Sequence, residues 1–335
     1  MKPILFAALP LLLTSSPVQN ETYTLKYAPD EGVILKRDFE VEGSLDLTDF
    51  SMTVDGEEPE LGETELSYVW SESIVVEDEL ISVDEGRPFE LVRTFSSLGQ
   101  ETVISGGEDE EDVELTSKSD LEGRRLRFEW DEDAEYYSVE ADDEEGDLEE
   151  LVLEWLEEDM DLRAVLPEDE VEIGDSWDID EAVYLPLMWP GGLLGFYDEE
   201  SDEEQADYQR EINQGKIENL SGEGEATLEE VREEGDVLVA VLRIELTIET
   251  AGEGTEVGGL TDIEHTAKIS RQLEGNLLWD ITNHHLHSLE IEAEVETRNL
   301  RAQVIEFEEE EHELEDEQVF TGILNYTATI ERESE

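Results

Sequence analysis

The stretch LEIEAEVE, from Leu289 to Glu296, alternates one apolar residue with one glutamate. Successive side chains of a β-strand point to opposite faces of the sheet, so this pattern predicts a strand with one buried and one solvated face. Burial on one face only is typical of antiparallel sheets, because parallel sheets are covered on both faces. The same alternation at residues 39–42 and 244–249 extends the prediction to much of the chain.

Turn residues and prolines divide the alternating runs. Glu234-Gly235-Asp236 separates two of them and predicts a hairpin, and Asp84–Pro88 predicts another. All nine prolines lie at or before Pro190. Because proline cannot donate to a sheet ladder, the later part of the chain is free to form unbroken strands. We predict an antiparallel meander of about five strands there, by the strand-signal rules.

Two segments depart from the strand pattern. In Asp147–Glu158 (DLEELVLEWLEE) the apolar residues recur at helical spacing, which predicts an amphipathic helix. A weaker, polar helix is predicted near 200–217. Between them, Tyr184–Phe196 is apolar but contains proline and glycine, and we expect a buried or groove-lining loop. The predicted fold is therefore mainly β, with long antiparallel strands in one or two curved sheets that are half-barrel or sandwich-like.

The composition along the chain suggests an exported protein. Lys2 followed by the apolar run Ile4–Leu13 is typical of a secretory signal peptide, which we place at residues 1–19. No later stretch is long and apolar enough for a transmembrane segment, and the absence of cysteine fits a bacterial envelope. We expect a periplasmic or extracellular location. The rest comprises a β-rich region with the first helix, an acidic connecting segment and the C-terminal meander, at residues 20–199, 200–221 and 222–335.

The charge excludes several classes of partner. The 335 residues include 96 Asp and Glu against 20 Lys and Arg, for a net charge of −76. Such a surface repels nucleic acids and anionic lipid headgroups, whereas diffuse cations are expected partners. A hydrophobic content of 38% is enough for a core, which argues against disorder. Excess acid with few lysines indicates a halophilic-like surface, because at 1 M salt a Debye length of about 3 Å screens the acids from one another.

One step in the sequence carries a family resemblance. A leucine-proline pair at Leu166-Pro167 is followed by Val171-Glu172-Ile173-Gly174-Asp175-Ser176-Trp177. This LPxxxVxxGDxW-type step resembles a motif of uncharacterised secreted bacterial β-rich proteins, over about residues 60 to 300. The resemblance implies an exported, non-catalytic β protein and supplies no active residues. Physically, the Gly-Asp pair is ordinary turn chemistry, which favours a structural role for the step.

Sequence signatures of catalysis are absent. There is no G-x-S-x-G elbow, H-E-x-x-H helix or Walker loop, and no cysteine nucleophile. We therefore assign no catalytic, cofactor-binding or metal-binding residue. His285 and His287 could share a strand face and hold a metal with a carboxylate, or lie with His284 in an exposed turn. Acidic runs could supply calcium ligands or form solvated loops, but none matches an EF-hand; they lie at 108–112, 142–145, 198–204 and 308–317.

Three hypotheses on function remain. The leading one is an exported, non-catalytic β-rich protein of the cell envelope or exterior with a salt-adapted acidic surface. The second is a periplasmic carrier of an apolar ligand, held in a groove between the curved strands, the 147–158 helix and the 184–196 loop. The third is a glycan hydrolase that uses two carboxylates, one of them with a raised pKa.

Overall fold

The computed structural model describes residues 21–59, 65–106, 112–142, 148, 150–198, 212–258, 261–307 and 310–333. Within these residues, 13 strands form one antiparallel sheet and two more form a small separate pair. The mainly β prediction is confirmed. The strands of the first part are β1 (Thr22–Tyr23), β2 (Ile34–Val54), β3 (Leu66–Asp84), β4 (Arg87–Gly106), β5 (Val113–Lys118), β6 (Arg125–Asp131) and β7 (Tyr136–Ala141).

The remaining strands include the predicted meander. The hairpin turn at Gly235 and five long antiparallel strands after residue 220 are confirmed. The strands are β8 (Val171–Glu172), β9 (Ser176–Asp178), β10 (Tyr197–Asp198), β11 (Ser221–Glu234), β12 (Val237–Gly258), β13 (Thr261–Asp280), β14 (His285–Phe307) and β15 (Glu310–Glu333).

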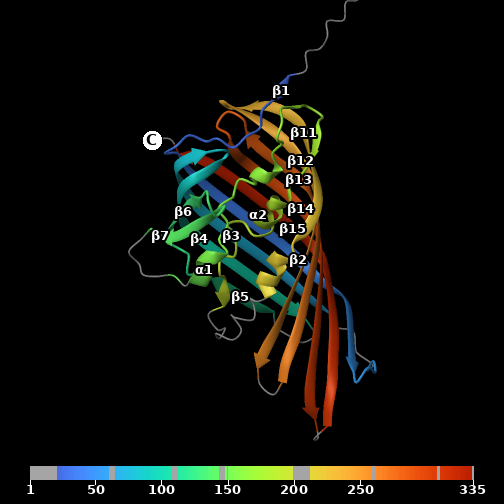
Figure 1. Ribbon diagram of the computed structural model, residues 1–335. Coiled ribbons are helices and arrows are strands. Elements are labelled where there is room, and N and C mark those ends of the chain that lie inside the picture. The colour runs from blue at the N-terminus through green and yellow to red at the C-terminus, as the bar shows by residue number, and fades with distance from the viewer. Residues whose placement is uncertain are drawn as a thin grey trace, which may run out of the picture.

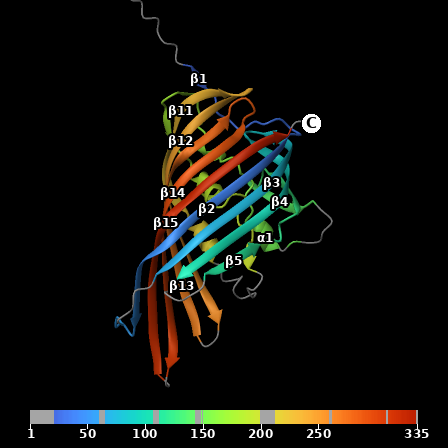
Figure 2. The ribbon, with the colours of Figure 1, turned by 180° about the vertical axis from the view of Figure 1, so that it is seen from behind.

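The strands form a single curved sheet that does not close on itself. Its path runs β10-β5-β4-β3-β2-β15-β14-β13-β12-β11-β9, with β6 paired to β4 and β7 to β6. The pairing of β15 with β2 brings the last and first long strands together in the middle of this path. The sheet wraps around a central segment that contains the short helix α2 (Tyr184–Met188), whereas the opposite, convex side presents the strands (Figures 1 and 2).

Alternation along the strands separates a concave buried face from a convex wet face. In β2, Leu35, Phe39 and Val41 are each at most 4% exposed, whereas Glu40 and Glu42 between and beside them are exposed. The same phase holds on β14, where the apolar residues of the LEIEAEVE stretch are buried and its glutamates are exposed. Burial of the apolar phase therefore offsets the poor strand propensity of glutamate.

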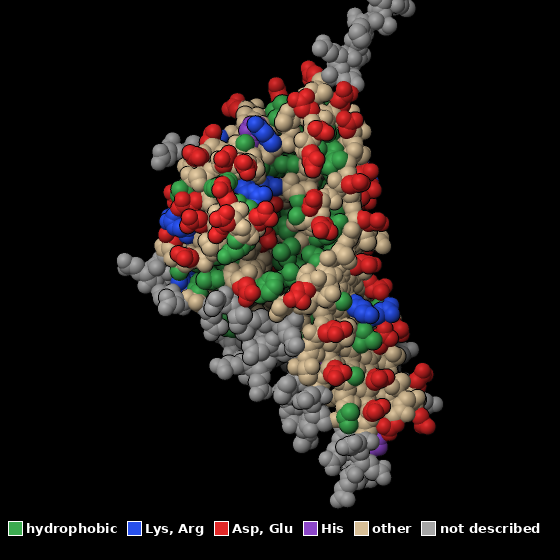
Figure 3. Space-filling view, viewed as in Figure 1, with side chains coloured by type: hydrophobic (Ala, Val, Ile, Leu, Met, Phe, Trp, Pro, Cys, Tyr) green, Lys and Arg blue, Asp and Glu red, His purple; other side chains and the backbone are tan. Residues whose placement is uncertain are grey.

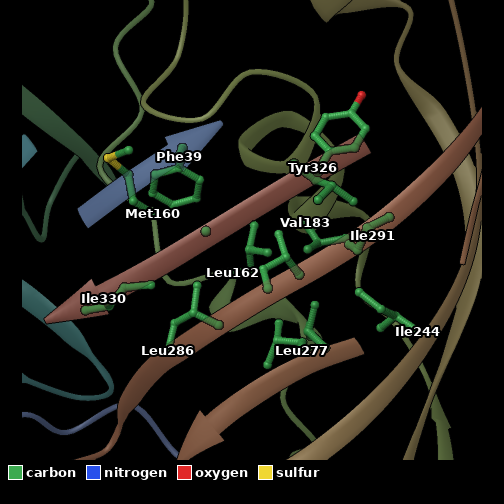
Figure 4. Close-up of a cluster of buried hydrophobic side chains, with 14 of the residues drawn as sticks. Phe39, Met160, Leu162, Val183, Ile244, Leu277, Leu286, Ile291, Tyr326 and Ile330 are labelled. Carbon is green, nitrogen blue, oxygen red and sulfur yellow. The ribbon is translucent and has the colours of Figure 1, made fainter. Parts of the chain in front are cut away.

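The concave face is filled by two stretches of chain, residues 157–165 and 179–194, which we call the plug. Their side chains Met160, Leu162 and Val183 are at most 1% exposed. Figure 4 shows them among apolar side chains of the sheet, including Leu286 and Ile291 of β14. The plug also contains two single turns of 3-10 helix, η1 (Arg163–Val165) and η2 (Glu181–Val183). The core is thus made between the sheet and the plug.

Three local predictions need correction. The first helix spans only Glu150–Glu154 (α1), because Leu156 already pairs with Gly192 in an isolated β-bridge. The stretch Tyr184–Phe196 is not entirely a loop, since α2 occupies its start. Proline is tolerated in the first turn of a helix, where its missing N–H needs no partner. Of the predicted second helix, residues 212–218 are helical and 200–211 lie outside the described residues, as does the predicted signal peptide.

A buried ionic network fastens the plug to the sheet. Asp78 on β3 accepts hydrogen bonds from Arg37 on β2 at 2.7 Å and from Arg93 on β4 at 2.8 and 2.9 Å. Arg37 also donates to Asp161 of the plug, and Arg93 donates to two plug carbonyls, those of Glu157 and Glu158, at 2.8 Å each. All four charged side chains of the network are at most 3% exposed.

The charges of this network balance. Burial by itself would raise the pKa of Asp78, but Arg93 and Arg37 outweigh that effect and hold the pKa below its ordinary value. Asp161 also accepts the backbone N–H of Leu286 at 3.1 Å, which connects β14 to the same network. Two arginines and two aspartates thus join the neighbouring strands β2, β3 and β4 to the more distant strand β14 and to the plug.

Removing one charge from this network is expected to destabilise the whole protein. Asp161→Asn keeps the side-chain size but leaves Arg37 with a single anionic partner in a buried place, at a cost of about 3 to 5 kcal/mol. Urea unfolding at fixed NaCl measures the change. Asp46→Asn, on the exposed face of β2, is the matched control and should stay within about 0.5 kcal/mol of the parent protein. Equal stability of the two variants would contradict the role given to the network.

Candidate functional site

Five polar side chains gather on the concave face beside the plug, and we call them the concave cluster. One member, Tyr326 of β15, connects the concave cluster with the plug, because it also borders a small void against Leu162 and Leu187 of the plug. Three further members lie on strands of the sheet, and the fifth lies on the helical residues 212–218. The members of the concave cluster are Glu72, Gln100, Lys216, Arg271 and Tyr326.

Strand register positions the members that come from the sheet. Glu72 on β3 lies directly opposite Gln100 on β4, and the Gln100 side-chain amide donates to the Glu72 carboxylate at 3.0 Å. Arg271 on β13 donates from Nη1 to the hydroxyl of Tyr326, and its guanidinium lies 5.9 Å from the centre of that ring. Arg271 is 9% exposed and Tyr326 is 3% exposed. Residues far apart in the chain therefore meet on the concave face of the sheet.

Lys216 reaches the concave cluster because its helix packs tightly on β12. Thr250 of β12 donates to the carbonyl of Lys216, and Asn219 donates to the carbonyl of Ala251 at 3.1 Å. Gly252 is required at this contact, since a Cβ there would overlap the carbonyl oxygen of Ile212. The Lys216 ammonium donates to the side chain of Asn213 at 3.4 Å, which is a neutral partner.

Burial shifts the titration of two cluster members. Burial raises the pKa of Glu72 to about 7, and the hydrogen bond from Gln100 and the charge of Arg271 offset only part of that rise. Burial, together with the positive charge of Arg271, lowers the pKa of Lys216 to about 8. Both shifts follow from the cost of burying a charge that lacks a close opposite partner.

The two cations of the concave cluster lack an ion pair. Across the described ranges of the chain, no carboxylate oxygen lies within 4.0 Å of the cationic nitrogens of Lys216 or Arg271. The Nε of Arg271 is buried without any hydrogen-bond partner. The arrangement is thus a buried guanidinium and a half-buried ammonium beside a carboxyl group whose pKa is raised by burial.

The predicted histidine group does not form a metal site in the part of the chain that is described, where no three His, Cys, Asp or Glu side chains could hold a metal ion together. His284 lies in the turn before β14 with φ 62°. His285 is 2% exposed with its Nδ1 2.6 Å from the carbonyl of Leu286, and burial lowers its pKa. His287 instead lies 3.6 Å from Glu234. The three histidines therefore contact different surroundings.

The other predicted features are placed as follows. In the Gly-Asp step, Gly174 has φ 96° in the turn between β8 and β9, and the indole of Trp177 donates to the carbonyl of Val165 at 2.7 Å. Of the acidic run 142–145, Asp142 accepts hydrogen bonds from Arg125 and Arg127. The other three runs lie wholly or partly outside the described residues, including 108–111 and 199–204.

Sequence reasoning missed the concave cluster, although a signal for it exists. Glu72 interrupts the apolar phase formed by Trp70, Ile74 and Val76, and Arg271 interrupts that of Ile269 and Leu273. A charged residue in the buried phase of a strand marks a polar group that needs a partner inside the protein. The sequence does not reveal which of these residues meet, because that depends on the order of the strands.

Comparison with known proteins adds little. No family model and no curated protein matches the chain. Three solved structures are each 8% identical to it: an outer membrane channel from Pseudomonas putida F1, OmpF of Salmonella typhi in complex with daunomycin, and a mutant of the Rh. blastica porin. The alignments cover 91%, 90% and 88% of this chain and 97%, 99% and 99% of those chains, with TM-scores of 0.20, 0.19 and 0.15. Scores this low carry no argument about fold or function. None of the described helices is long and apolar enough to cross a membrane.

Glu72 is expected to make stability depend on pH. Its pKa in the folded protein is raised from 4.5 to about 7, so the fold favours the protonated form. The stabilisation is complete below about pH 4.5 and is lost as the pH rises through 7. In the parent protein the unfolding free energy should decline over that range by about 3 kcal/mol because of Glu72, and Glu72→Gln should remove this part of the decline.

Urea unfolding at a series of pH values, at constant salt, measures this difference. Glu101→Gln is the control, because Glu101 is exposed on the neighbouring strand β4. Glu101→Gln should follow the pH profile of the parent protein. A Glu72→Gln profile parallel to that of the parent protein would show that Glu72 is ionised at ordinary cost.

Proposed function

We propose that this chain is an exported, non-catalytic β-rich protein of the cell envelope or exterior, with a convex acidic face adapted to saline or divalent-rich surroundings. One observation carries the proposal. Four glutamates on neighbouring strands, Glu225, Glu245, Glu274 and Glu292, are paired side by side across β11 to β14, and all are exposed. Like charges directly opposite each other on a sheet destabilise it.

The acids of this row have little internal compensation. Arg243 lies 2.7 Å from Glu245 and 2.6 Å from Glu274. The row also borders a shallow trough of about 570 Å³ on the convex side, whose acidic lining comprises Asp178, Glu223, Glu225, Glu245, Glu274, Glu292 and Glu294. Acidic side chains are also numerous around the concave side, which Figure 3 shows. Dissolved cations are the simplest source of the missing counter-charge, and they act through screening rather than at a specific site.

The carrier hypothesis finds little room inside the fold. The plug occupies the space between the strands, and the void left against Phe39, Leu162 and Leu289 measures about 10 Å³. That volume is at or below what one water molecule requires. The 184–196 segment fills the concave face instead of lining an empty groove, so we do not propose an enclosed apolar ligand.

Among the described residues, the two carboxyl groups whose pKa is raised to about 7 do not form the pair that the hydrolase hypothesis requires. Burial raises the pKa of Glu72, and the groups that offset part of this rise are Gln100 and Arg271, neither of which is a carboxylate. Glu158 also has a pKa raised to about 7 by burial, yet it is 5% exposed and bonded to Arg163 within the plug. Neither presents a cleft with an acid and a nucleophile.

The proposal predicts that stability rises with salt and then levels off. The unfolding midpoint should increase steeply up to about 1 M NaCl, where the Debye length is about 3 Å, and change little beyond it. Glu292→Gln should stabilise the protein by roughly 0.2 to 1 kcal/mol at low salt and have no effect at high salt, because it removes one like-charge neighbour from the row.

Thermal unfolding by circular dichroism measures both effects. Glu42→Gln is the matched control, because Glu42 lies on the same face with neutral residues, Asn325 and Ser71, on either side. It should be less stabilising than Glu292→Gln at low salt. A midpoint that is the same at low and high salt would overturn the proposed salt adaptation.

Export predicts a processed N-terminus. Protein recovered from the envelope or medium of its native host should begin within Ser15–Asn20, as N-terminal sequencing can establish. Recovery only from the cytoplasm, with Met1 or Lys2 retained at the N-terminus, would contradict export.

A further inference from the structure

The buried Arg271 and the half-buried Lys216 differ from the two arginines of the ionic network. Arg37 and Arg93 each have an aspartate within 2.8 Å. Lys216 and Arg271 have none within 4.0 Å in the described part of the chain, although acids outnumber bases by 96 to 20. A shortage of acids therefore cannot explain why these two cations have no ion-pair partner. In the described part of the chain, no carboxylate within 4.0 Å neutralises their positive charge.

The donors of this pair are arranged for an additional acceptor. Arg271 is 9% exposed, and its Nε has no hydrogen-bond partner. Its Nη1 donates a hydrogen bond to the hydroxyl of Tyr326. That hydroxyl can in turn donate its own hydrogen to an acceptor. A buried guanidinium N–H without an acceptor costs free energy, and an oxyanion would satisfy it with charge-assisted hydrogen bonds.

The surroundings of the pair combine polar and apolar groups. Leu45, Trp70 and Ile269 are only partly buried and pack against the core from the concave phase of their strands. On the same side of the molecule, Figure 3 shows apolar side chains gathered in a hollow between the β6–β7 side and the β12–β14 side. An anionic group at the cations could therefore carry an apolar chain along this face.

We propose that Arg271 and Lys216 form a binding site for an oxyanion, a carboxylate or a phosphate, present either as a free ion or as the headgroup of an amphiphile. Arg271 supplies planar guanidinium donors, and Lys216 supplies a compact charge from the facing helix. The hydroxyl of Tyr326 is the third donor. The proposal is independent of salt adaptation, since it concerns the concave face and not the acidic convex one.

Isothermal titration calorimetry with defined probes tests the site. The probes are dodecanoate below its micelle concentration, acetate and inorganic phosphate as free oxyanions, and 1-dodecanol as the uncharged analogue. The full protein is used at a salt concentration where it is folded. We expect one saturable site for at least one oxyanion probe and binding of 1-dodecanol about tenfold weaker than that of dodecanoate, or weaker still. Dodecanoate binding alone identifies an amphiphile, and equal binding of acetate or phosphate identifies a free ion.

Three substitutions locate the site. Lys216→Gln and Arg271→Gln should each weaken the binding of the oxyanion probe about tenfold or more. Lys268→Gln removes the same charge from an exposed position on β13 and should change affinity less than about twofold. Arg271→Lys, which keeps the charge but loses the guanidinium fork, is measured in case Arg271→Gln fails to fold, and it should also weaken binding. Absence of saturable binding by every oxyanion probe, or unchanged affinity in Lys216→Gln, would overturn the proposal.

Discussion

The structure depends on the buried network in which Arg37 and Arg93 share Asp78 while Asp161 completes the charge balance. A curved antiparallel sheet with one apolar face must cover that face, and here the cover is a stretch of chain with little regular structure of its own. Its backbone is strained at one point, since Leu162 has φ 53°, in the left-handed region. The cost of about 1 to 2 kcal/mol is offset because Asp161 is bonded to the network while Leu162 itself is buried in the core.

Charge is distributed differently on the two sides of the sheet. On the convex side, rows of glutamates repel one another and face water. On the concave side, the ionic groups beneath the plug balance, and the pair Arg271 and Lys216 is positive. Although the total charge is −76, arginines held by strand register, together with Lys216 on its helix, make these ionic groups of the concave side neutral or positive. The sheet therefore separates two electrostatic environments as well as two hydrophobic ones.

The sequence specifies the strands more completely than it specifies what covers them. The period-two alternation of LEIEAEVE correctly predicts β14, and the absence of proline after Pro190 correctly predicts five long strands. The plug is not predictable in this way, because its α-helix, α2, has five residues and is too short for a helical period to be recognised. The concave cluster was inaccessible for another reason. Glu72 and Arg271 are each recognisable as charged residues in an apolar phase, but only the strand order brings together residues so distant in the chain.

The acidic surface and the cationic pair impose opposite requirements on an anion. Approach to the protein is opposed by the glutamate rows, whose field extends about 10 Å at 0.1 M salt and about 3 Å at 1 M salt. Contact with Arg271 takes place at a buried guanidinium, where mobile ions screen an interaction much less than at the surface. Rising salt thus weakens the long-range repulsion more than the short-range attraction. Under the two proposals, the ionic conditions that stabilise the convex face are therefore also those in which an oxyanion meets the least resistance on its way to the concave face.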